Sequence, residues 1–321
     1  PWPPAETGEQ PLFRLIPNTI GQVWHLSVQK EVLLCGHDNG AFMIQGLEAT
    51  PLSTVRGAWT FLQLPGIPGK LIGGTYQGLT VYRYLPDRKR WEFERLLPGF
   101  RESSRIMEED RQGNLWMTHG FKGAYRIRLS SNADSILSME FYNKEKGFVT
   151  NTYINVYKVD GTPLFAAREG IFRYNGETNR FEHDTLRERS FATREHISYI
   201  RQDDKSNIWF VAGGKPALLR LGEDGRYNMV KNPFSLIHNH MVGGFEMIYP
   251  WSGDHIFFGL ENGFAHYTPG TAPSGNQPFK AYIRRVETGG GLYFAGNDST
   301  TAKNGSLPEF RYRDNSVRFS Y

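Results

Sequence analysis

The histidines and one acidic run come closest, by residue type and spacing, to metal-binding or catalytic chemistry in this sequence. Nine histidines are present, and the two closest together are His238 and His240, in the segment His-Asn-His. An extended strand would place both imidazoles on one side. A metal site needs three or four converging ligands, and neither a cysteine pair nor a His-Glu motif accompanies this segment. We therefore expect no metal ion and no cofactor.

The acidic run consists of Glu108, Glu109 and Asp110. Glycoside hydrolysis needs two carboxylates that converge across one bond, but adjacent residues of a strand point to opposite faces. An enzyme that binds a carboxylate substrate would also need a cluster of arginines. The arginines available for such a cluster are Arg101, Arg105, Arg168 and Arg194. We expect no enzymatic activity, and the alternative is a lyase or glycosidase that acts on glycans.

Nucleotide binding, serine hydrolysis and nucleic-acid binding find no support in the sequence. It contains no Gly-x-Gly-x-x-Gly, no Gly-x-x-x-x-Gly-Lys-Ser/Thr and no Gly-x-Ser-x-Gly motif. Lys plus Arg number 37 against 33 for Asp plus Glu, so the net charge is only +4, and the basic residues form no stripe. No run of about 18 apolar residues occurs. This segment is expected to meet a membrane only through other parts of a longer protein.

A repeated pattern must position any site in the chain. The segments 105–127 and 199–221 align, since each has an apolar strand, an aspartate, a Gly-Asn or Ser-Asn turn and a tryptophan. The spacing from Asp110 to Trp116 is six residues, as it is from Asp203 to Trp209. Weaker copies lie at 32–44, 70–84, 163–175 and 255–267. The turn before the third strand falls at Gly40, Gly78, Gly123, Gly170, Ala217 and Gly263, in steps of 38 to 47 residues.

Each copy is predicted to form a four-stranded antiparallel sheet with short glycine turns. In the third copy the strands are expected at 102–110, 114–120, 123–129 and 137–143. A sheet of this size cannot bury both faces alone, so the copies must pack face to face around an axis. The predicted fold is an all-β β-propeller at 20–279, with six four-stranded blades visible and a seventh left open. The 35 glycines and 18 prolines agree with many turns and argue against a helical bundle.

Trp116 and Trp209 are predicted to pack between blades, with Asp110 and Asp203 capping the turns before them. The same packing position is assigned to Leu34, Ile72, Phe165 and Phe257 in the other copies. The sixth copy has only three strands before the Pro- and Gly-rich stretch 268–279. Residues 11–17, within an N-terminal segment 1–19, are expected to add its outer strand and close the ring. The alternative is that they belong to a preceding blade.

The repeat stops at Lys280, and residues 280–321 are predicted to begin an immunoglobulin-like β-sandwich. The ending RYRDNSVRFSY alternates apolar and polar residues on both sides of an Asp-Asn turn, as a pair of sandwich strands would. About 40 residues are too few for a complete sandwich.

Taken together, these motifs resemble the two-component regulator propeller family of bacterial sensor proteins. The aspartate, Gly/Ser-Asn, Leu/Ile-Trp and glycine pattern carries the resemblance, and KGFVTNTYINVYKVDG at 146–161 is similar to the family's blade opening. The ending LPEFRYRDNSVRFSY looks like the start of the triple-tyrosine domain that follows such propellers. The resemblance implies the periplasmic part of a homodimeric Bacteroidetes membrane sensor, with a histidine-kinase or LuxR-type output that regulates transcription.

The ligand site is predicted on the face where the loops before the inner strands gather with the turns between second and third strands. We call this the front face. Its residues differ from blade to blade, as asymmetric contacts to a ligand require. Its polar, aromatic and basic groups suit a hydroxylated and acidic ligand such as a glycan fragment. The candidate residues are Tyr76, Arg101, Arg105, His119, Arg168 and Arg194. The expected function is ligand sensing through reorientation of protomers, and the alternatives are the glycan-active enzyme and a spacer that holds two protomers together.

Overall fold

The computed structural model describes residues 15–252, 255–269, 285–288, 291–295, 311–314 and 316–320. The chain divides into two compact units, Pro1–Gly270 and Thr271–Tyr321. Within these described residues, no helix is long and apolar enough to cross a membrane.

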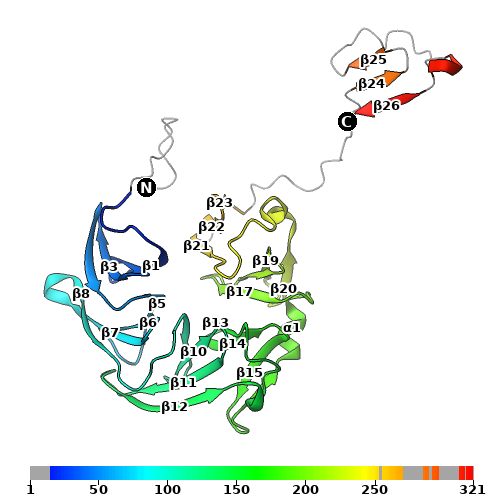
Figure 1. Cartoon of the computed structure of the whole chain (residues 1–321). Helices are drawn as coiled ribbons and strands as arrows, with labels where there is room; N and C mark the ends of the chain where they lie inside the picture. Colours follow the sequence, from blue (N-terminus) through cyan, green and yellow to red (C-terminus); the bar gives the residue numbers. More distant parts are fainter. Residues whose placement is uncertain are drawn as a thin grey trace. The chain divides into compact units, whose positions relative to one another are not determined.

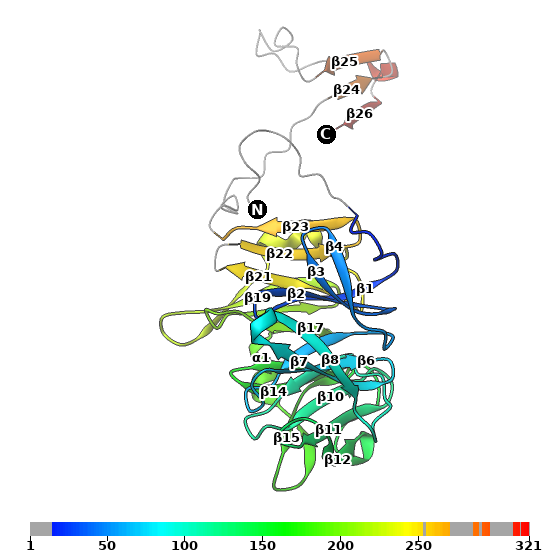
Figure 2. The same ribbon diagram turned by 90° about the vertical axis from the view of Figure 1, so that its left-hand side faces the viewer.

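The first unit is built from six antiparallel sheets that follow one another along the chain. Each sheet keeps its strands in sequence order, with four strands in the first five sheets and three described strands in the sixth. Figure 1 shows the sheets arranged around a common centre, from the blue first sheet to the yellow sixth, and Figure 2 shows them from the side. The predicted β-propeller is confirmed.

The strands and helices of this unit have the following bounds. The first sheet contains β1 (Val23–Gln29), β2 (Val32–His37), β3 (Gly40–Gln45) and β4 (Glu48–Ser53), and the second contains β5 (Thr60–Gln63), β6 (Lys70–Thr75), β7 (Gly78–Leu85) and β8 (Arg90–Leu96). The third contains β9 (Ile106–Glu109), β10 (Leu115–His119), β11 (Gly123–Leu129) and β12 (Ile136–Tyr142), and the fourth contains β13 (Asn155–Val159), β14 (Thr162–Ala167), β15 (Gly170–Asn175) and β16 (Arg180–His183). The fifth contains β17 (Ile197–Gln202), β18 (Ile208–Ala212), β19 (Lys215–Leu221) and β20 (Tyr227–Val230), and the sixth contains β21 (Ile248–Ser252), β22 (His255–Leu260) and β23 (Gly263–Tyr267). The short helices are η1 (Pro86–Arg88), η2 (Lys144–Lys146), α1 (Thr185–Ser190) and η3 (Asn232–Ile237).

Five apolar clusters join the neighbouring sheets in pairs. The cluster between the third and fourth sheets, for example, contains Trp116 and Ala124 from one side and Val156 and Phe165 from the other. Equivalent clusters lie at the other four junctions, from the first and second sheets to the fifth and sixth. The first strands approach one another at the centre, where β9 lies beside β13 and β13 beside β17. The loops before these first strands therefore meet around the axis.

Trp116 and Trp209 lie at equivalent places on β10 and β18, and their side chains are 1% and 2% exposed. Each indole N–H donates a hydrogen bond of 2.9 Å to the aspartate six residues earlier, Asp110 or Asp203. The Asp110 carboxylate also accepts the backbone N–H of Asn114 at 2.9 Å. One carboxylate thus closes the turn and fixes the orientation of the tryptophan that packs against the next sheet.

Two residues of the predicted repeat register are corrected. Trp116 faces the following sheet, whereas Phe165 faces the preceding one, so its neighbour Leu164 holds the position equivalent to Trp116. Successive strand residues point to opposite faces of the sheet, so a register error of one residue assigns a side chain to the wrong face. In the fifth sheet, Ala217 lies inside β19, and the turn is made by Gly213 and Gly214 at φ of 54° and 73°. These two glycines adopt the left-handed conformation that a two-residue hairpin turn needs.

Only part of the predicted closing strand is described. Residues 11–14 lie outside the described part of the chain, and Leu15, Ile16 and Pro17 are not in a strand. The side chain of Ile16 packs against Cys35, Phe42 and Ile44 of the first sheet. Closure of the sixth blade by residues 11–17 stays a prediction.

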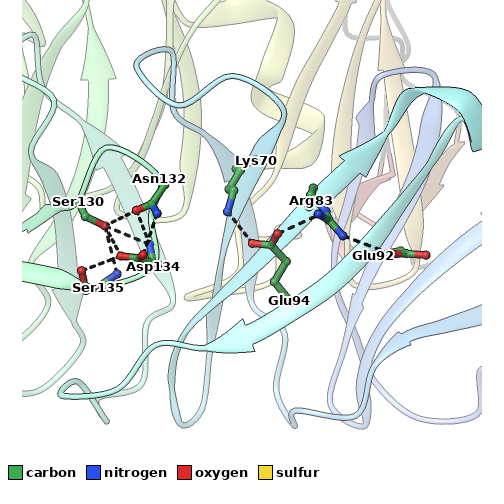
Figure 3. A network of polar contacts seen from close by, with 8 residues as sticks. All are labelled: Lys70, Arg83, Glu92, Glu94, Ser130, Asn132, Asp134 and Ser135. Atoms are coloured by element: carbon green, nitrogen blue, oxygen red, sulfur yellow. Dashed lines mark hydrogen bonds and ion pairs between the residues drawn. The ribbon is translucent and has the colours of Figure 1, made fainter.

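Polar networks fix outer strands and loops away from the axis (Figure 3). On the second sheet, Lys70 Nζ lies 2.7 Å from one oxygen of Glu94, and Arg83 Nε lies 3.4 Å from the other. On the third sheet, the loop at 130–135 closes around Asp134, whose carboxylate accepts hydrogen bonds from Ser135, Ser130 and Asn132. These bonds lower the pKa of Asp134 to about 2. The networks hold strand β8 and the turn after β11, and neither faces the centre of the ring.

The second unit contains a three-stranded sheet in the order β25-β24-β26. Its strands are β24 (Arg285–Thr288), β25 (Gly291–Ala295) and β26 (Val317–Ser320), with a short 3-10 helix η4 (Tyr312–Asp314) before β26. The predicted strand pair at 311–321 therefore has one strand, because Tyr312–Asp314 is helical. The immunoglobulin-like identity of this unit stays a prediction.

We predict that Trp116→Ala lowers the free energy of unfolding by about 3–5 kcal/mol, because the lost ring leaves a cavity between two sheets. Trp116→Phe should cost less, since it keeps a ring and loses mainly the hydrogen bond to Asp110. Urea denaturation followed by circular dichroism measures both. Trp251 is 52% exposed, so Trp251→Ala is the control and should change the value by about 0.5 kcal/mol or less. Equal losses in Trp116→Ala and Trp251→Ala would contradict the packing role.

Candidate ligand-binding site

A cavity of about 850 Å³ lies where the first strands of the sheets converge. Its walls come from β1, β5, β9, β13 and β17 and from the segment before β21. Because each sheet contributes a different sequence at this position, the wall is asymmetric. Cavities of this size accommodate small-molecule ligands.

Three aromatic rings and one arginine surround the front-face end of the cavity. The ring centroids of Trp24 and Trp59 are 4.3 Å apart, and Phe245 stacks on Trp24 at 5.5 Å with an interplanar angle of 21°. The guanidinium carbon of Arg105 lies 4.3 Å from the Phe245 centroid and 5.8 Å from that of Trp59. Arg105 also donates a hydrogen bond to the carbonyl of Gly244. This end of the cavity offers flat apolar surfaces beside a cation.

Hydroxyl and carboxylate groups occupy the wall formed by the fourth and fifth sheets. The Ser198 hydroxyl donates a hydrogen bond of 2.7 Å to Glu246, and Tyr157 donates to the carbonyl of Ser198. The Tyr199 hydroxyl donates to the carbonyl of Ile248 at 3.0 Å. Burial raises the pKa of Tyr157 and of Tyr199, so both phenols stay protonated and keep these bonds, and their oxygens can accept hydrogen bonds from a ligand. This wall suits a ligand rich in hydroxyl groups or other hydrogen-bonding atoms.

A third set of cavity residues carries charge. Burial raises the pKa of Glu108 to about 7, against the opposing effect of Lys158 and Arg201. Burial, assisted by the charge of Arg201, lowers the pKa of His25 to about 4. At neutral pH, His25 is therefore uncharged and Glu108 is only partly ionised. The cavity wall carries the cations Arg105, Lys158 and Arg201 and, besides Glu108, the carboxylates of Asp203 and Glu246, so groups of both signs are available to a ligand. The three cations can bind acidic or hydrogen-bond-accepting groups.

The structure brings one of the six predicted site residues into the cavity wall and a second next to a wall residue. Arg105 lines the cavity, and the ring of Tyr76 lies 5.1 Å from that of Trp59 at the front-face end. Arg101 is exposed on the segment before β9. The imidazole of His119 accepts a hydrogen bond from the Phe121 N–H and lies 3.9 Å from the Glu102 carboxylate. Burial and then Lys122 lower the pKa of His119.

Arg168 and Arg194 lie elsewhere on the front face. The guanidinium of Arg168 lies 5.3 Å from the ring centroid of Tyr153. Arg194 borders a separate open hollow beside α1, where His183 and Glu188 are 2.6 Å apart. Of the six predicted residues, only Arg105 lines the cavity, and the role of all six in ligand binding stays a prediction.

Sequence reasoning missed most of the cavity wall. The missed residues are Trp24, His25, Glu108, Tyr157, Lys158, Ser198, Tyr199, Arg201, Phe245 and Glu246. Most of them stand on the first strand of a blade, and that position was available as a signal once the repeat was assigned. The rule that binding residues concentrate on loops favours the front-face loops over these strand positions. The alternation of strand residues argues against a pair of adjacent carboxylates, but Glu108 lines the cavity as a single buried carboxyl group.

The segment His238 to His240 is a turn and not an extended strand. It follows η3, and Asn239 has a φ of 60°, so the extended conformation expected for this segment is wrong. Among the described residues, no three histidine, cysteine or acidic side chains gather as metal ligands.

Two solved structures that share this fold are extracellular domains of bacterial signalling systems. The extracellular domain of the hybrid two-component system BT3049 from B. thetaiotaomicron superposes with a TM-score of 0.59 and 17% identity, covering 93% of this chain and 39% of that one. The extracellular domain of the one-component system BT4673 from the same organism superposes with a TM-score of 0.51 and 15% identity, covering 79% of this chain and 39% of that one. The chain therefore spans about two-fifths of these proteins. No protein-family model and no curated protein matches the sequence. At such identities the likeness establishes the fold, and the propeller that the repeat predicts is confirmed.

We predict that Glu108 makes stability depend on pH. Because its folded pKa of about 7 exceeds the ordinary value of 4.5, the unfolded chain releases this proton at a lower pH than the folded chain. The contribution of Glu108 to the free energy of unfolding should fall as the pH rises from about 5 to 8. Glu108→Gln removes this dependence, so the free energy of unfolding of the variant should increase relative to that of the native protein as the pH rises.

Urea titrations at several pH values measure this difference, and comparing variant with native protein at each pH removes the contribution of His25. Glu177 is exposed, so Glu177→Gln is the matched control and should stay parallel to the native protein. A constant difference between Glu108→Gln and the native protein would show that Glu108 ionises normally.

Proposed function

We propose that this chain is the ligand-sensing propeller of a bacterial signal-transduction protein and acts outside the cytoplasm, in the periplasm. The observation that carries the proposal is the asymmetric, partly charged cavity on the propeller axis, with walls from five blades and the segment before β21. The extracellular domains of two-component and one-component systems with the same fold support the placement.

The ligand is a glycan fragment or another small polar molecule with acidic or hydroxyl groups. Trp24 and Trp59 offer flat surfaces on which a sugar ring can stack, and Arg105 stands beside them. Tyr157, Ser198 and their neighbours supply hydrogen-bonding groups along the wall. A few convergent polar groups within a partly apolar cavity are the usual composition of a specific small-molecule site.

The signal is relayed by reorientation of two protomers. A ligand shifts an equilibrium only as far as it binds one state better than the other. Within each propeller, five apolar clusters couple the six sheets, and packed interfaces of this kind resist gradual deformation. The change should therefore appear between protomers and not within a blade.

An enzyme that acts on glycans is the second candidate, and one observation favours it. The cavity holds Glu108, whose pKa of about 7 suits a general acid, together with the carboxylate of Glu246. Glycosidases use one protonated and one ionised carboxyl group. Incubation with mixed oligosaccharides distinguishes the candidates, because cleaved products indicate the enzyme, a thermal shift without cleavage indicates the sensor, and neither result indicates the structural spacer.

We predict that Arg105→Gln abolishes the thermal shift caused by a binding oligosaccharide, because Arg105 lines the cavity. Arg168→Gln is a matched control: Arg168 also lies over an aromatic ring, but it does not line the cavity. Differential scanning fluorimetry with an oligosaccharide library measures both variants. Retention of the shift in Arg105→Gln together with its loss in Arg168→Gln would place the site on the outer front face and contradict a cavity site.

We also predict that ligand changes the distance between protomers of the parent sensor and leaves each propeller unchanged. Small-angle scattering of its dimeric extracytoplasmic region, with and without the binding oligosaccharide, measures the first quantity. Hydrogen exchange of strands β10 and β18 measures the second. Altered exchange in these strands with unchanged scattering would contradict the relay.

A further inference from the structure

The segment Met241–Met247 crosses the front-face end of the cavity, and we call it the strap. It starts at Met241, which is 5% exposed and forms a β-bridge with Leu260. It ends where Ile248 begins β21, with a fully buried side chain. Between these anchors, Gly243, Gly244 and Phe245 are exposed, although Phe245 also lines the cavity. The strap is therefore fixed at both ends and solvated in the middle.

The strap contacts four other blades through a small number of side chains. Phe245 stacks on Trp24 of the first blade at 5.5 Å and lies 6.4 Å from Trp59 before the second. Arg105, before the third blade, lies over the same ring and donates to the Gly244 carbonyl. Glu246 accepts the hydrogen bond of Ser198 in the fifth blade. Phe245 thus occupies a position between an arginine and two tryptophans at the mouth of the cavity.

The local chemistry allows the strap to move while its anchors stay in place. Within the strap, the Phe245 N–H donates to the Val242 carbonyl at 2.9 Å, and at its end the Met247 carbonyl accepts the Gly259 N–H at 2.9 Å. Residues 242–246 belong to no strand, so no ladder of strand bonds holds the middle of the strap. Gly244 has a φ of 76°, and a Cβ atom at Gly243 or Gly244 would meet nothing within 4 Å. Partly exposed contacts between a cation and an aromatic ring are weak. Segments with few buried contacts open more easily than the core that carries them.

We propose that the strap is the size filter of the cavity, with Phe245 as the residue that closes the front-face mouth. When the strap lies as in the structure, the rings of Phe245, Trp24 and Trp59 and the Arg105 guanidinium fill the mouth. When Phe245 leaves this position, the mouth opens and larger molecules pass. The selection of ligands by this filter rests on the proposed function. Closure of the mouth does not, because it is a property of the unliganded chain.

A cysteine placed inside the cavity tests the filter without any ligand. Asn155 lines the cavity and does not belong to the strap, and the natural Cys35 is 2% exposed. The reporter is Asn155→Cys, and the chain without the reporter supplies the blank for Cys35. Its labelling rate is measured by mass spectrometry with fluorescein maleimide, a bulky reagent, and with methyl methanethiosulfonate, a small one.

Adding Phe245→Ala to the reporter should raise the rate for fluorescein maleimide by about fivefold or more and change the rate for the small reagent by less than about twofold. Phe245→Trp restores a large ring and should return the bulky reagent to the original rate or below. Phe121 is 74% exposed on a front-face turn, so Phe121→Ala is the control and should change neither rate.

Equal rates for fluorescein maleimide with and without Phe245, whether fast or slow, would overturn the filter. An equal rise for both reagents would also overturn it, because it indicates general loosening of the fold. Since no oligosaccharide is used, the filter can fail while the sensor proposal stands. The sensor proposal fails instead when no oligosaccharide produces a thermal shift.

Discussion

Burial of sheet faces against the neighbouring sheets is the interaction on which the rest of this structure depends. A four-stranded sheet with two apolar faces is not stable alone, and the five clusters between successive sheets supply the missing contacts. Wedge-like packing of this kind brings the first strands together at one centre, and the cavity follows from that convergence. The side chains at the centre have neighbours across the ring as well as beside them. They can therefore differ from blade to blade without disturbing the interfaces.

The repeat was predictable because its structural residues must satisfy the same geometry in every copy. Asp110 and Asp203 accept the same turn and indole hydrogen bonds, and a short carboxylate six residues before a tryptophan is needed for that arrangement. Glycines such as Gly78 and Gly123 stand where φ exceeds 120° and where a Cβ atom would lie about 2.2 Å from a carbonyl oxygen of the same sheet or its connection. Requirements this local leave a signal in the sequence.

The cavity was less predictable, because its members are defined by convergence and not by a pattern. Nothing in the sequence near Trp24 or Phe245 relates the two residues, which are separated by most of the ring and yet stack in the structure. The acidic run illustrates the same limit, since Glu109 is buried within the fold, Asp110 closes a turn and Glu108 lines the cavity. Three adjacent carboxylates have three separate roles, and only the role of Asp110 follows from its spacing. Residue Arg105 was found for its charge before an inner strand, although its partners could not be foreseen.

The two ends of the series of sheets have the least support from their neighbours, and this bears on the strap. On the first sheet, Leu26 and Val28 point away from the second sheet and are 58% and 67% exposed, so among the described residues this face has less packing than the five junctions. The sixth sheet reaches the first through the strap, where Phe245 stacks on Trp24. Among the described residues, this aromatic contact links the first and sixth sheets at the front face, and in the proposed filter the same ring closes the mouth of the cavity. A change that moves Phe245 should therefore alter the mouth and this one contact, whereas the five apolar clusters between the sheets do not involve Phe245 and keep the blades in place.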